Sequence, residues 1–441
     1  MDNKFFLRLA EIKMKDFMGV EYGELTFSRL KHDWNDEEKF WRSNVVGIYG
    51  PNGSSKTTVV ESLQLLKRVV DISTAMIDSE LRCQFFTPPF PGHYIRVGSD
   101  TAELTFLFHC CSDEGPIAKS IRYSFSITGD DPLKIENELF QILDEKGKAI
   151  HSLSTKGIAD NLTDFFESLV DPNQTIPRLT DNTSICNDMS LILQYSKILP
   201  ASQKKEARIL FNQFAEIITY HMEILFEDRE KAMLRNDSLP TIPIPLIPFS
   251  KFPYGLDLKN GEIIGPNHLC GKKETVSETL LRQVNYLGDT LETLVPNIRL
   301  SVKDEKDKLV MYVDKDDVSI PLEKESYGIK KLIYLCCYIP ALFQSSAYML
   351  IIDELDEGLF EHLLGSILMA IQNKAEGQLI FTAHNLRPLQ CLDHGSIRFA
   401  LLPSDTDKDQ TKKTNQYSEI NCLNKRSNLR DIYYNALNTE E

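Results

Sequence analysis

The stretch Val45-Val46-Gly47-Ile48-Tyr49-Gly50-Pro51-Asn52-Gly53-Ser54-Ser55-Lys56-Thr57 decides the fold of this chain. It begins as an apolar run typical of a buried strand, continues as a loop of small residues, and leads into a helix with an apolar period. Such a strand-loop-helix unit directs backbone N–H groups toward a phosphate, and the helix adds its positive N-terminal end. The stretch therefore predicts an α/β protein with a phosphate-binding loop that binds ATP.

The Lys56-Thr57 pair at the end of the loop supplies the remaining chemistry. The lysine reaches the β- and γ-phosphate oxygens, which makes it a candidate catalytic residue, and the threonine hydroxyl is a ligand for Mg²⁺. A loop that merely joins a strand to a helix has no need of this pair. The predicted nucleotide-binding residues are Gly50, Pro51, Asn52, Gly53, Ser54, Ser55, Lys56, Thr57 and Thr58.

Ser55 stands where loops of this kind have a glycine before the lysine. Its Cβ strains a turn that glycine makes freely, or crowds the phosphate. We therefore expect nucleotide binding to survive and hydrolysis to be slow.

A second apolar run, Ala347–Ile352, ends in the carboxylates Asp353 and Glu354. Strands buried on both faces have this composition, and their carboxyl ends form the ligand-binding edge of a parallel sheet. We expect Asp353 to hold Mg²⁺ together with Thr57, and Glu354 to be the general base that activates water. The plainer alternative is a strand that ends in two surface acids.

The strand expected next, Gln378–Asn385, carries His384 near its end. The helix-like run Glu361–Lys374 lies between the two strands, which indicates a parallel β-α-β crossover. His384 is then at the same sheet edge as the paired acids, where its ring could contact the γ-phosphate or position the attacking water. A histidine at a strand end is otherwise an ordinary loop residue.

Together these motifs resemble those of the ABC-type ATPases of the SMC, RecF and OLD branch. The opening segment Leu7–Val20 is similar to the first strand and turn of that branch, and Tyr22–Phe27 to its returning strand. Glu325–Leu332 resembles a degenerate signature motif. Asp353–Phe360 and Phe381–Pro388 are similar to segments of stand-alone ATPases from bacterial antiphage and abortive-infection systems, such as the AbiL, PARIS and Septu groups.

The resemblance implies that two chains act together. In this branch the signature motif contacts the nucleotide held by the other protomer, and the matching residues here are Ser326 and Gly328. ATP would then join two chains head to tail, as a homodimer or within a higher oligomer. The residues leave one alternative open, in which Ser326 is an ordinary N-cap of a helix that continues through Cys336.

Composition limits the partners of the chain. Its 441 residues carry a formal net charge of −15. No overall attraction to DNA, RNA or an anionic membrane is therefore expected, although a local basic patch could still bind nucleic acid. The nine cysteines show no C-x-x-C spacing, which favours a reducing cytoplasm, and no signal sequence or membrane-spanning run is visible.

Changes of pattern divide a chain of this length into parts. We expect an α/β fold, an ABC-type P-loop head with a mixed and parallel sheet, an antiparallel β subdomain and a helical insertion. The expected parts are 1–150 (N-terminal lobe with the phosphate-binding loop and the antiparallel sheet), 151–238 (helical insertion), 239–295 (proline-rich connector and helix), 296–402 (C-terminal lobe with the signature motif, the paired acids and the histidine) and 403–441 (C-terminal extension).

Local periodicity adds elements to these parts. The alternating prolines of Leu239–Phe249 predict extended chain, either packed on the head or exposed to a partner. Helical spacing predicts helices over Ile158–Val170, Met189–Ile198, Gln203–Met233 and Leu280–Leu294. Strands are predicted over Thr101–His109, Ile121–Thr128, Lys134–Leu143, Ile298–Val302, Leu309–Val313, Ser319–Leu322 and Glu419–Leu423.

Too little chain follows Leu402 for the TOPRIM nuclease domain that OLD-family proteins carry. We therefore expect an ATPase that is a nucleotide-dependent switch or sensor for a separate effector protein, a nuclease or a toxin. A setting in antiphage defence rests on the resemblance alone. Two alternatives are a RecF-like DNA-binding repair ATPase and a non-hydrolysing ATP-bound scaffold. The basic stretch 424–434 is expected to pack on the head rather than to bind nucleic acid.

Overall fold

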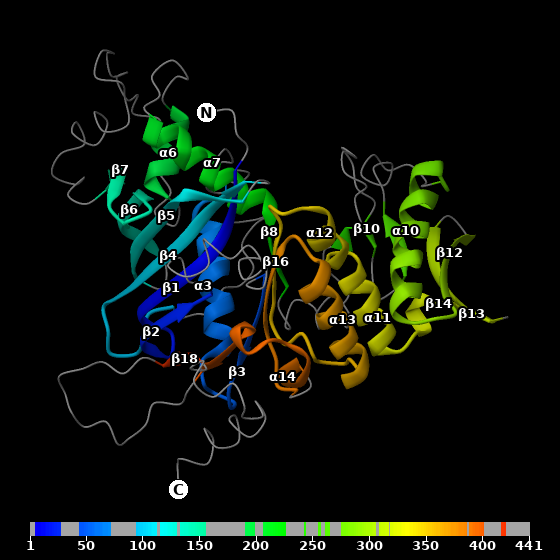
Figure 1. The fold of residues 1–441 in the computed structure, drawn as a ribbon. Coiled ribbons are helices and arrows are strands. Elements are labelled where there is room, and N and C mark those ends of the chain that lie inside the picture. Colours follow the sequence, from blue (N-terminus) through cyan, green and yellow to red (C-terminus); the bar gives the residue numbers. More distant parts are fainter. Residues whose placement is uncertain are drawn as a thin grey trace, which may run out of the picture.

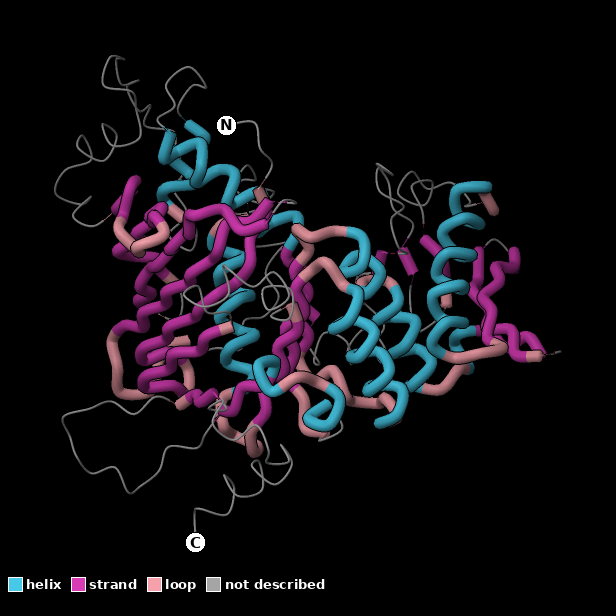
Figure 2. Tube along the Cα trace, in the orientation of Figure 1, coloured by secondary structure: helices cyan, strands magenta, loops and turns pink. Residues whose placement is uncertain are grey.

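The computed structural model describes residues 5–27, 44–71, 94–112, 115–129, 133–155, 190–198, 206–225, 242–243, 255–256, 261–264, 275–305, 308–316, 318–385, 388–400 and 416–419. These residues form layers on both faces of a central sheet (Figure 1). An antiparallel sheet lies on one side of the central sheet, and a group of helices followed by a third sheet lies on the other (Figure 2).

The central sheet has the strand order β18-β17-β3-β16-β15-β8. All neighbouring pairs are parallel except β17 and β18. Helix α13 (Glu361–Lys374) joins β15 to its parallel neighbour β16, which confirms the predicted crossover. The strands are β3 (Val45–Tyr49), β8 (Met222–Leu225), β15 (Met349–Ile352), β16 (Gln378–Thr382), β17 (Ile397–Ala400) and β18 (Tyr417–Glu419).

Successive residues of the central strands enter two different hydrophobic cores. Ile351 and Ile380 belong to the core shared with the antiparallel sheet. Ile352 and Phe381 belong to the core on the helical side. Because side chains alternate across a strand, a sheet covered on both faces needs uninterrupted apolar runs. This explains why β3, β15 and β16 could be predicted as buried strands from the sequence.

The antiparallel sheet has the order β2-β1-β4-β5-β6-β7 and confirms the predicted strands near residues 101, 121 and 134. Helix α3 (Lys56–Val69) packs between this sheet and the central one, because Val59, Leu63 and Leu66 recur at helical spacing and are fully buried. The strands are β1 (Phe6–Phe17), β2 (Val20–Thr26), β4 (Thr101–Ser112), β5 (Gly115–Thr128), β6 (Lys134–Asp144) and β7 (Ala149–Ser154).

The third sheet, on the helical side, has the order β12-β13-β11-β10-β9, with β14 paired to β13. Its predicted strands near residues 298, 309 and 319 and the predicted helix near 280 are confirmed. The strands are β9 (Ile242–Pro243), β10 (Gly255–Leu256), β11 (Glu262–Ile264), β12 (Ile298–Glu305), β13 (Lys308–Lys315) and β14 (Val318–Pro321). The helical segments are α10 (Glu278–Leu294), η2 (Leu322–Lys324), α11 (Tyr327–Cys336), α12 (Ile339–Gln344), α14 (Pro388–Cys391) and η3 (His394–Ser396).

The predicted helix over Gln203–Met233 is wrong at Met222–Leu225, and residues 226–233 lie outside the described residues. The chain forms α7 (Glu206–His221) and then enters β8, which pairs in parallel with β15 in the central sheet. Helix α6 (Leu191–Ile198) lies within the predicted Met189–Ile198. Strand β18 begins at Tyr417, two residues before the start of the strand predicted over Glu419–Leu423. The predicted helix Ile158–Val170, most of Leu239–Phe249 and the stretch 424–434 lie outside the described residues.

Candidate nucleotide-binding site

The phosphate-binding loop lies where predicted, between β3 and α3. Lys56 is buried, and its Nζ donates hydrogen bonds to the carbonyl oxygens of Gly50 at 2.8 Å and Pro51 at 3.0 Å. The lysine therefore folds back over its own loop. A Cβ on Gly50 would collide with the carbonyl oxygen of Ala400, so this position requires glycine.

Two residues of the loop have left-handed backbone. Gly53 has φ +80, as expected for a glycine in a tight turn. Ser55 has φ 68 and ψ 31, immediately before the first residue of α3. The departure noticed in the sequence is thus a real conformational cost, because a residue with a Cβ is disfavoured in this region by about 1–2 kcal/mol.

Asp353 follows β15 and its side chain is almost fully buried. Its Oδ1 accepts a hydrogen bond from Thr382 Oγ1 at 2.6 Å and lies 3.4 Å from Thr57 Oγ1. Burial raises the pKa of Asp353, while the hydrogen bonds from Thr382 and Thr57 oppose that rise. One carboxylate and one hydroxyl oxygen thus face each other, and such hard oxygen donors fit Mg²⁺.

Thr382, at the end of β16, is a site residue that sequence reasoning missed. Besides donating to Asp353, its Oγ1 accepts a hydrogen bond from the Glu354 backbone N–H at 2.8 Å. One hydroxyl therefore fixes both acids at the end of the neighbouring strand. The only available signal was its position two residues before His384 in a run expected to be a strand.

Glu354 and His384 are also brought together. Glu354 Oε1 lies 3.5 Å from His384 Nε2, and both side chains are partly exposed. Asp356 Oδ2 accepts hydrogen bonds from the backbone N–H groups of His384 at 3.0 Å and Asn385 at 2.6 Å. The loop after β15 thereby holds the loop after β16, which places the histidine beside the acid.

Lys56 of the phosphate-binding loop interacts electrostatically with the acidic residues that follow β15. Burial lowers the pKa of this lysine, whereas the nearby carboxylates of Glu354, Asp353 and Asp356 oppose the decrease. All of these groups stand at the carboxyl edge of the parallel strands β3, β15 and β16, where open α/β sheets bind ligands. The arrangement can accept a polyanion with a divalent cation and offers a base beside it.

The predicted signature residues lie at the start of α11. Ser326 is the N-cap of this helix, and its side chain accepts from the Ile329 N–H at 3.4 Å, as the N-cap alternative requires. A Cβ on Gly328 would lie 3.1 Å from the carbonyl oxygen of Gly358, which belongs to the loop that follows the paired acids. The start of α11 thus packs against that loop.

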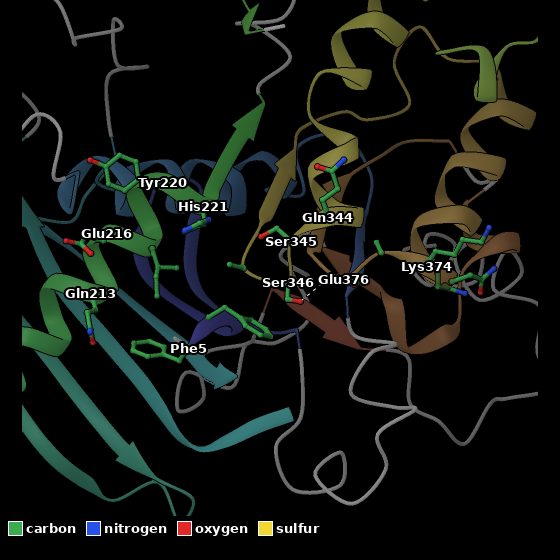
Figure 3. Close-up of a pocket in the computed structure, with 16 residues that line it drawn as sticks. Phe5, Gln213, Glu216, Tyr220, His221, Gln344, Ser345, Ser346, Lys374 and Glu376 are labelled. Atoms are coloured by element: carbon green, nitrogen blue, oxygen red, sulfur yellow. Dashed lines mark hydrogen bonds between the residues drawn. The ribbon is translucent and has the colours of Figure 1, made fainter. Parts of the chain in front are cut away.

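A large cavity lies elsewhere in the described structure (Figure 3). It has a volume of about 1170 Å³ and lies next to the end of α7, the segment before β15 and the segment before β16. Ser346 and Glu376 therefore line the amino edge of the central sheet, opposite the phosphate-binding loop. This cavity is not the nucleotide site.

Comparison with known proteins agrees with a P-loop domain. A family model described as "AAA domain, putative AbiEii toxin, Type IV TA system" matches residues 45–387, from the strand before the phosphate-binding loop to just beyond His384. The chain belongs to this AAA-domain family. No curated protein matches its sequence. Within the described residues, no helix is both long enough and apolar enough to cross a bilayer.

Several solved structures of SMC head domains are similar in fold. An SMC head bound to the C-terminal winged-helix domain of ScpA shares 14% identity at a TM-score of 0.44, over 89% of this chain and 93% of that one. The Thermotoga maritima SMC head shares 12% identity at a TM-score of 0.39, over 90% and 96%. An SMC head with an extended coiled coil, bound to a ScpA domain from Pyrococcus furiosus, shares 13% at 0.40, over 89% and 92%.

Proposed function

We propose that this chain is an ABC-type ATPase whose nucleotide state switches a separate effector protein. One observation carries the proposal. The lysine of the loop, the Thr57–Asp353 pair and the Glu354–His384 pair, which come from three segments of the sequence, meet at one edge of the parallel sheet. A triphosphate and its magnesium require this combination of charges.

Each residue has a definable part in hydrolysis. Lys56 would leave its loop carbonyls and neutralise the β- and γ-phosphate oxygens. Thr57 and Asp353 would hold Mg²⁺, which when bound supplies further charge neutralisation. Glu354 would take the proton of the attacking water, and His384, 3.5 Å away, would orient that water or contact the γ-phosphate.

The proposal includes ATP-dependent dimerisation through Ser326 and Gly328. Ser326 and Gly328 stand at a helix N-terminus, which favours anions. In a head-to-tail pair they would face the γ-phosphate of the partner chain, and ATP would stabilise the pair by binding to it preferentially. Because α11 also packs against the loop after Glu354, hydrolysis and dissociation would be linked through Gly358.

An aspartate at position 326 separates this role from simple capping. Aspartate is a good N-cap, so Ser326→Asp preserves the helix, but its charge repels a phosphate. In a Glu354→Gln background with MgATP, light scattering should give a dimer, and adding Ser326→Asp should give a monomer. The matched control is Ser277→Asp at the N-cap of α10, where the side chain accepts from Leu280 N–H at 3.1 Å. If both aspartates leave the dimer intact, Ser326 is only a cap.

Control of an effector is supported by the family, whose description names a toxin and a toxin–antitoxin system. We place this chain as the ATP-dependent member of such a system, in antiphage defence, with the nuclease or toxin on another polypeptide. The purified chain with Mg²⁺ should then leave DNA and RNA intact. Cleavage by the chain alone that persists in Glu354→Gln would exclude the two-component arrangement.

The left-handed Ser55 specifically favours a second function, an ATP-bound scaffold that does not turn over. A strained loop could hold ATP while positioning it poorly for attack. Measured turnover, with and without the partner protein, separates the two functions. A scaffold shows none in either case, whereas a switch shows hydrolysis that depends on Glu354.

A further inference from the structure

Strand β18 brings a tyrosine from the end of the described chain to the phosphate-binding loop. The Tyr417 hydroxyl donates a hydrogen bond to the carbonyl oxygen of Ser55 at 2.9 Å, although the two residues are 362 positions apart. The Tyr417 side chain is buried. Its backbone is fixed by antiparallel pairing with Ala400 of β17, whose carbonyl oxygen is the atom that requires glycine at position 50.

The β1–β2 hairpin completes the surroundings of this hydrogen bond. A Cβ on Gly19, in the hairpin turn, would lie 3.2 Å from Ser55 Oγ. A Cβ on Gly23, in β2, would lie 2.6 Å from the Tyr417 ring. The backbone N–H of Gln416 also donates to the Tyr22 carbonyl oxygen at 3.3 Å. Hairpin, strand β18 and loop therefore pack together at Ser55.

The backbone conformation of Ser55 explains what these contacts would stabilise. A serine with φ 68 is strained, so the loop would relax toward other conformations unless neighbours held it. The Tyr417 hydroxyl donates to the carbonyl oxygen of this residue, and Gly19 of the hairpin lies next to its side chain. A glycine at this position would need no such support.

We infer that Tyr417 is a positioning residue for nucleotide binding, which holds Ser55 in the left-handed conformation that the phosphate-binding loop needs. This inference rests on the proposed function, because it takes the loop to bind ATP. It makes strand β18 a part of the nucleotide site. The competing explanation is a buried tyrosine that merely satisfies its hydroxyl, with no consequence specific to Ser55.

A double-mutant cycle on Tyr417→Phe and Ser55→Gly distinguishes the two explanations, with MgATP affinity as the readout. Removing one hydroxyl should weaken binding about five- to tenfold when residue 55 is serine. With Ser55→Gly the same substitution should change affinity less than twofold, because glycine accepts the conformation unaided. A loss of equal size in both backgrounds, or no loss in either, overturns the inference. Tyr334→Phe, an equally buried tyrosine of α11, is the control.

Amide hydrogen exchange on the unmodified chain tests the same link without any substitution. Saturating MgATP should slow amide exchange in residues 416–419 as well as in the loop. The reason is that the hydrogen bond from Tyr417 to Ser55 links the two segments, so that fixing the loop also fixes β18. Protection of the loop with unchanged exchange in 416–419 contradicts the role of Tyr417 and leaves the proposed ATPase standing. Absence of any MgATP binding by the wild-type chain instead contradicts the proposed function itself.

Discussion

Ser55 holds φ 68, a left-handed conformation that a glycine would adopt without strain, and Glu354 of the same site also has a positive φ of 49. Ser55→Gly should raise the free energy of unfolding by about 0.5 kcal/mol, which is the left-handed penalty less the greater entropy of an unfolded glycine. ATP turnover should rise severalfold. Gly53→Ala is the matched control, because φ is +80 and a Cβ would touch nothing, so this change should lower stability by about 1 kcal/mol. An unchanged turnover for Ser55→Gly would contradict the expectation that Ser55 limits hydrolysis.

Thr382 should matter for the rate of hydrolysis as much as a residue that touches ATP. Thr382→Val keeps the shape of the side chain but removes the hydroxyl between Asp353 and the Glu354 N–H. We expect kcat to fall at least tenfold, at a cost to stability of about 1–2 kcal/mol. Thr382→Ser, which retains the hydroxyl, should keep most of the activity. Steady-state kinetics in which the valine variant stays within twofold of wild type would contradict this role.

His109 predicts a pH dependence of stability that is separate from the site. It is buried in the antiparallel sheet, beside Ser120 at 3.1 Å, and burial lowers its pKa to about 4. The unfolded state therefore binds a proton more readily, so this contribution to stability is complete above about pH 6.5 and is lost as the pH falls toward 4. From pH 6.5 to pH 4 the free energy of unfolding of wild type should fall by about 3 kcal/mol more than that of His109→Gln. Urea unfolding of both proteins that gives parallel pH profiles would contradict this.

At the residue scale, the sequence was informative wherever chemistry is encoded locally. Lys56-Thr57 follows a loop of small residues and Asp353-Glu354 follows an apolar run, and the structure brings Thr57 and Asp353 together. Thr382 and Tyr417 act through contacts with residues 28 and 362 positions away. No local sequence pattern predicts such contacts, because a threonine or a tyrosine is an ordinary residue in a strand.

Among the elements, helix α6 depends on a carboxylate from another layer. The buried Glu138 of β6 accepts hydrogen bonds from the Leu191 N–H at 2.9 Å, the Ile192 N–H at 3.3 Å, the Tyr123 hydroxyl at 2.5 Å and the Ser190 hydroxyl. Glu138→Gln would replace one accepting oxygen by an NH₂ group, which cannot accept from these N–H and O–H groups. It should lower the free energy of unfolding by about 2 kcal/mol. Glu136→Gln, exposed on the same strand, should change stability by less than about 0.5 kcal/mol. Equal unfolding midpoints for the two variants would contradict the anchoring role.

Elements with a clear period were predicted well, and α13 has the bounds expected from its sequence. Strand β8 was missed because Met222–Leu225 continues the apolar character of α7 without a turn signal. A four-residue buried strand and the last turn of a helix have the same composition. Only the partner strand β15 decides between them, and that partner is more than a hundred residues away.

At the scale of the whole molecule, the two cores meet along the central sheet, and the nucleotide site lies at one edge of this boundary. Helix α3 belongs to the core shared with the antiparallel sheet, whereas α11, with its predicted signature residues, belongs to the core on the helical side. Movement of one side relative to the other would therefore change the distance between Lys56 and the signature helix. On the proposed function, the two nucleotide states would differ in this distance.

The central claim is that Lys56, Asp353, Glu354 and His384 act on a single ATP. It is tested most directly by filtering the protein after one turnover with radiolabelled MgATP and identifying the nucleotide that stays bound. Wild type should carry ADP, whereas Glu354→Gln should retain intact ATP, with conversion slowed more than about 100-fold. Retention of no nucleotide by either protein, or conversion at the same rate in both, would contradict the account.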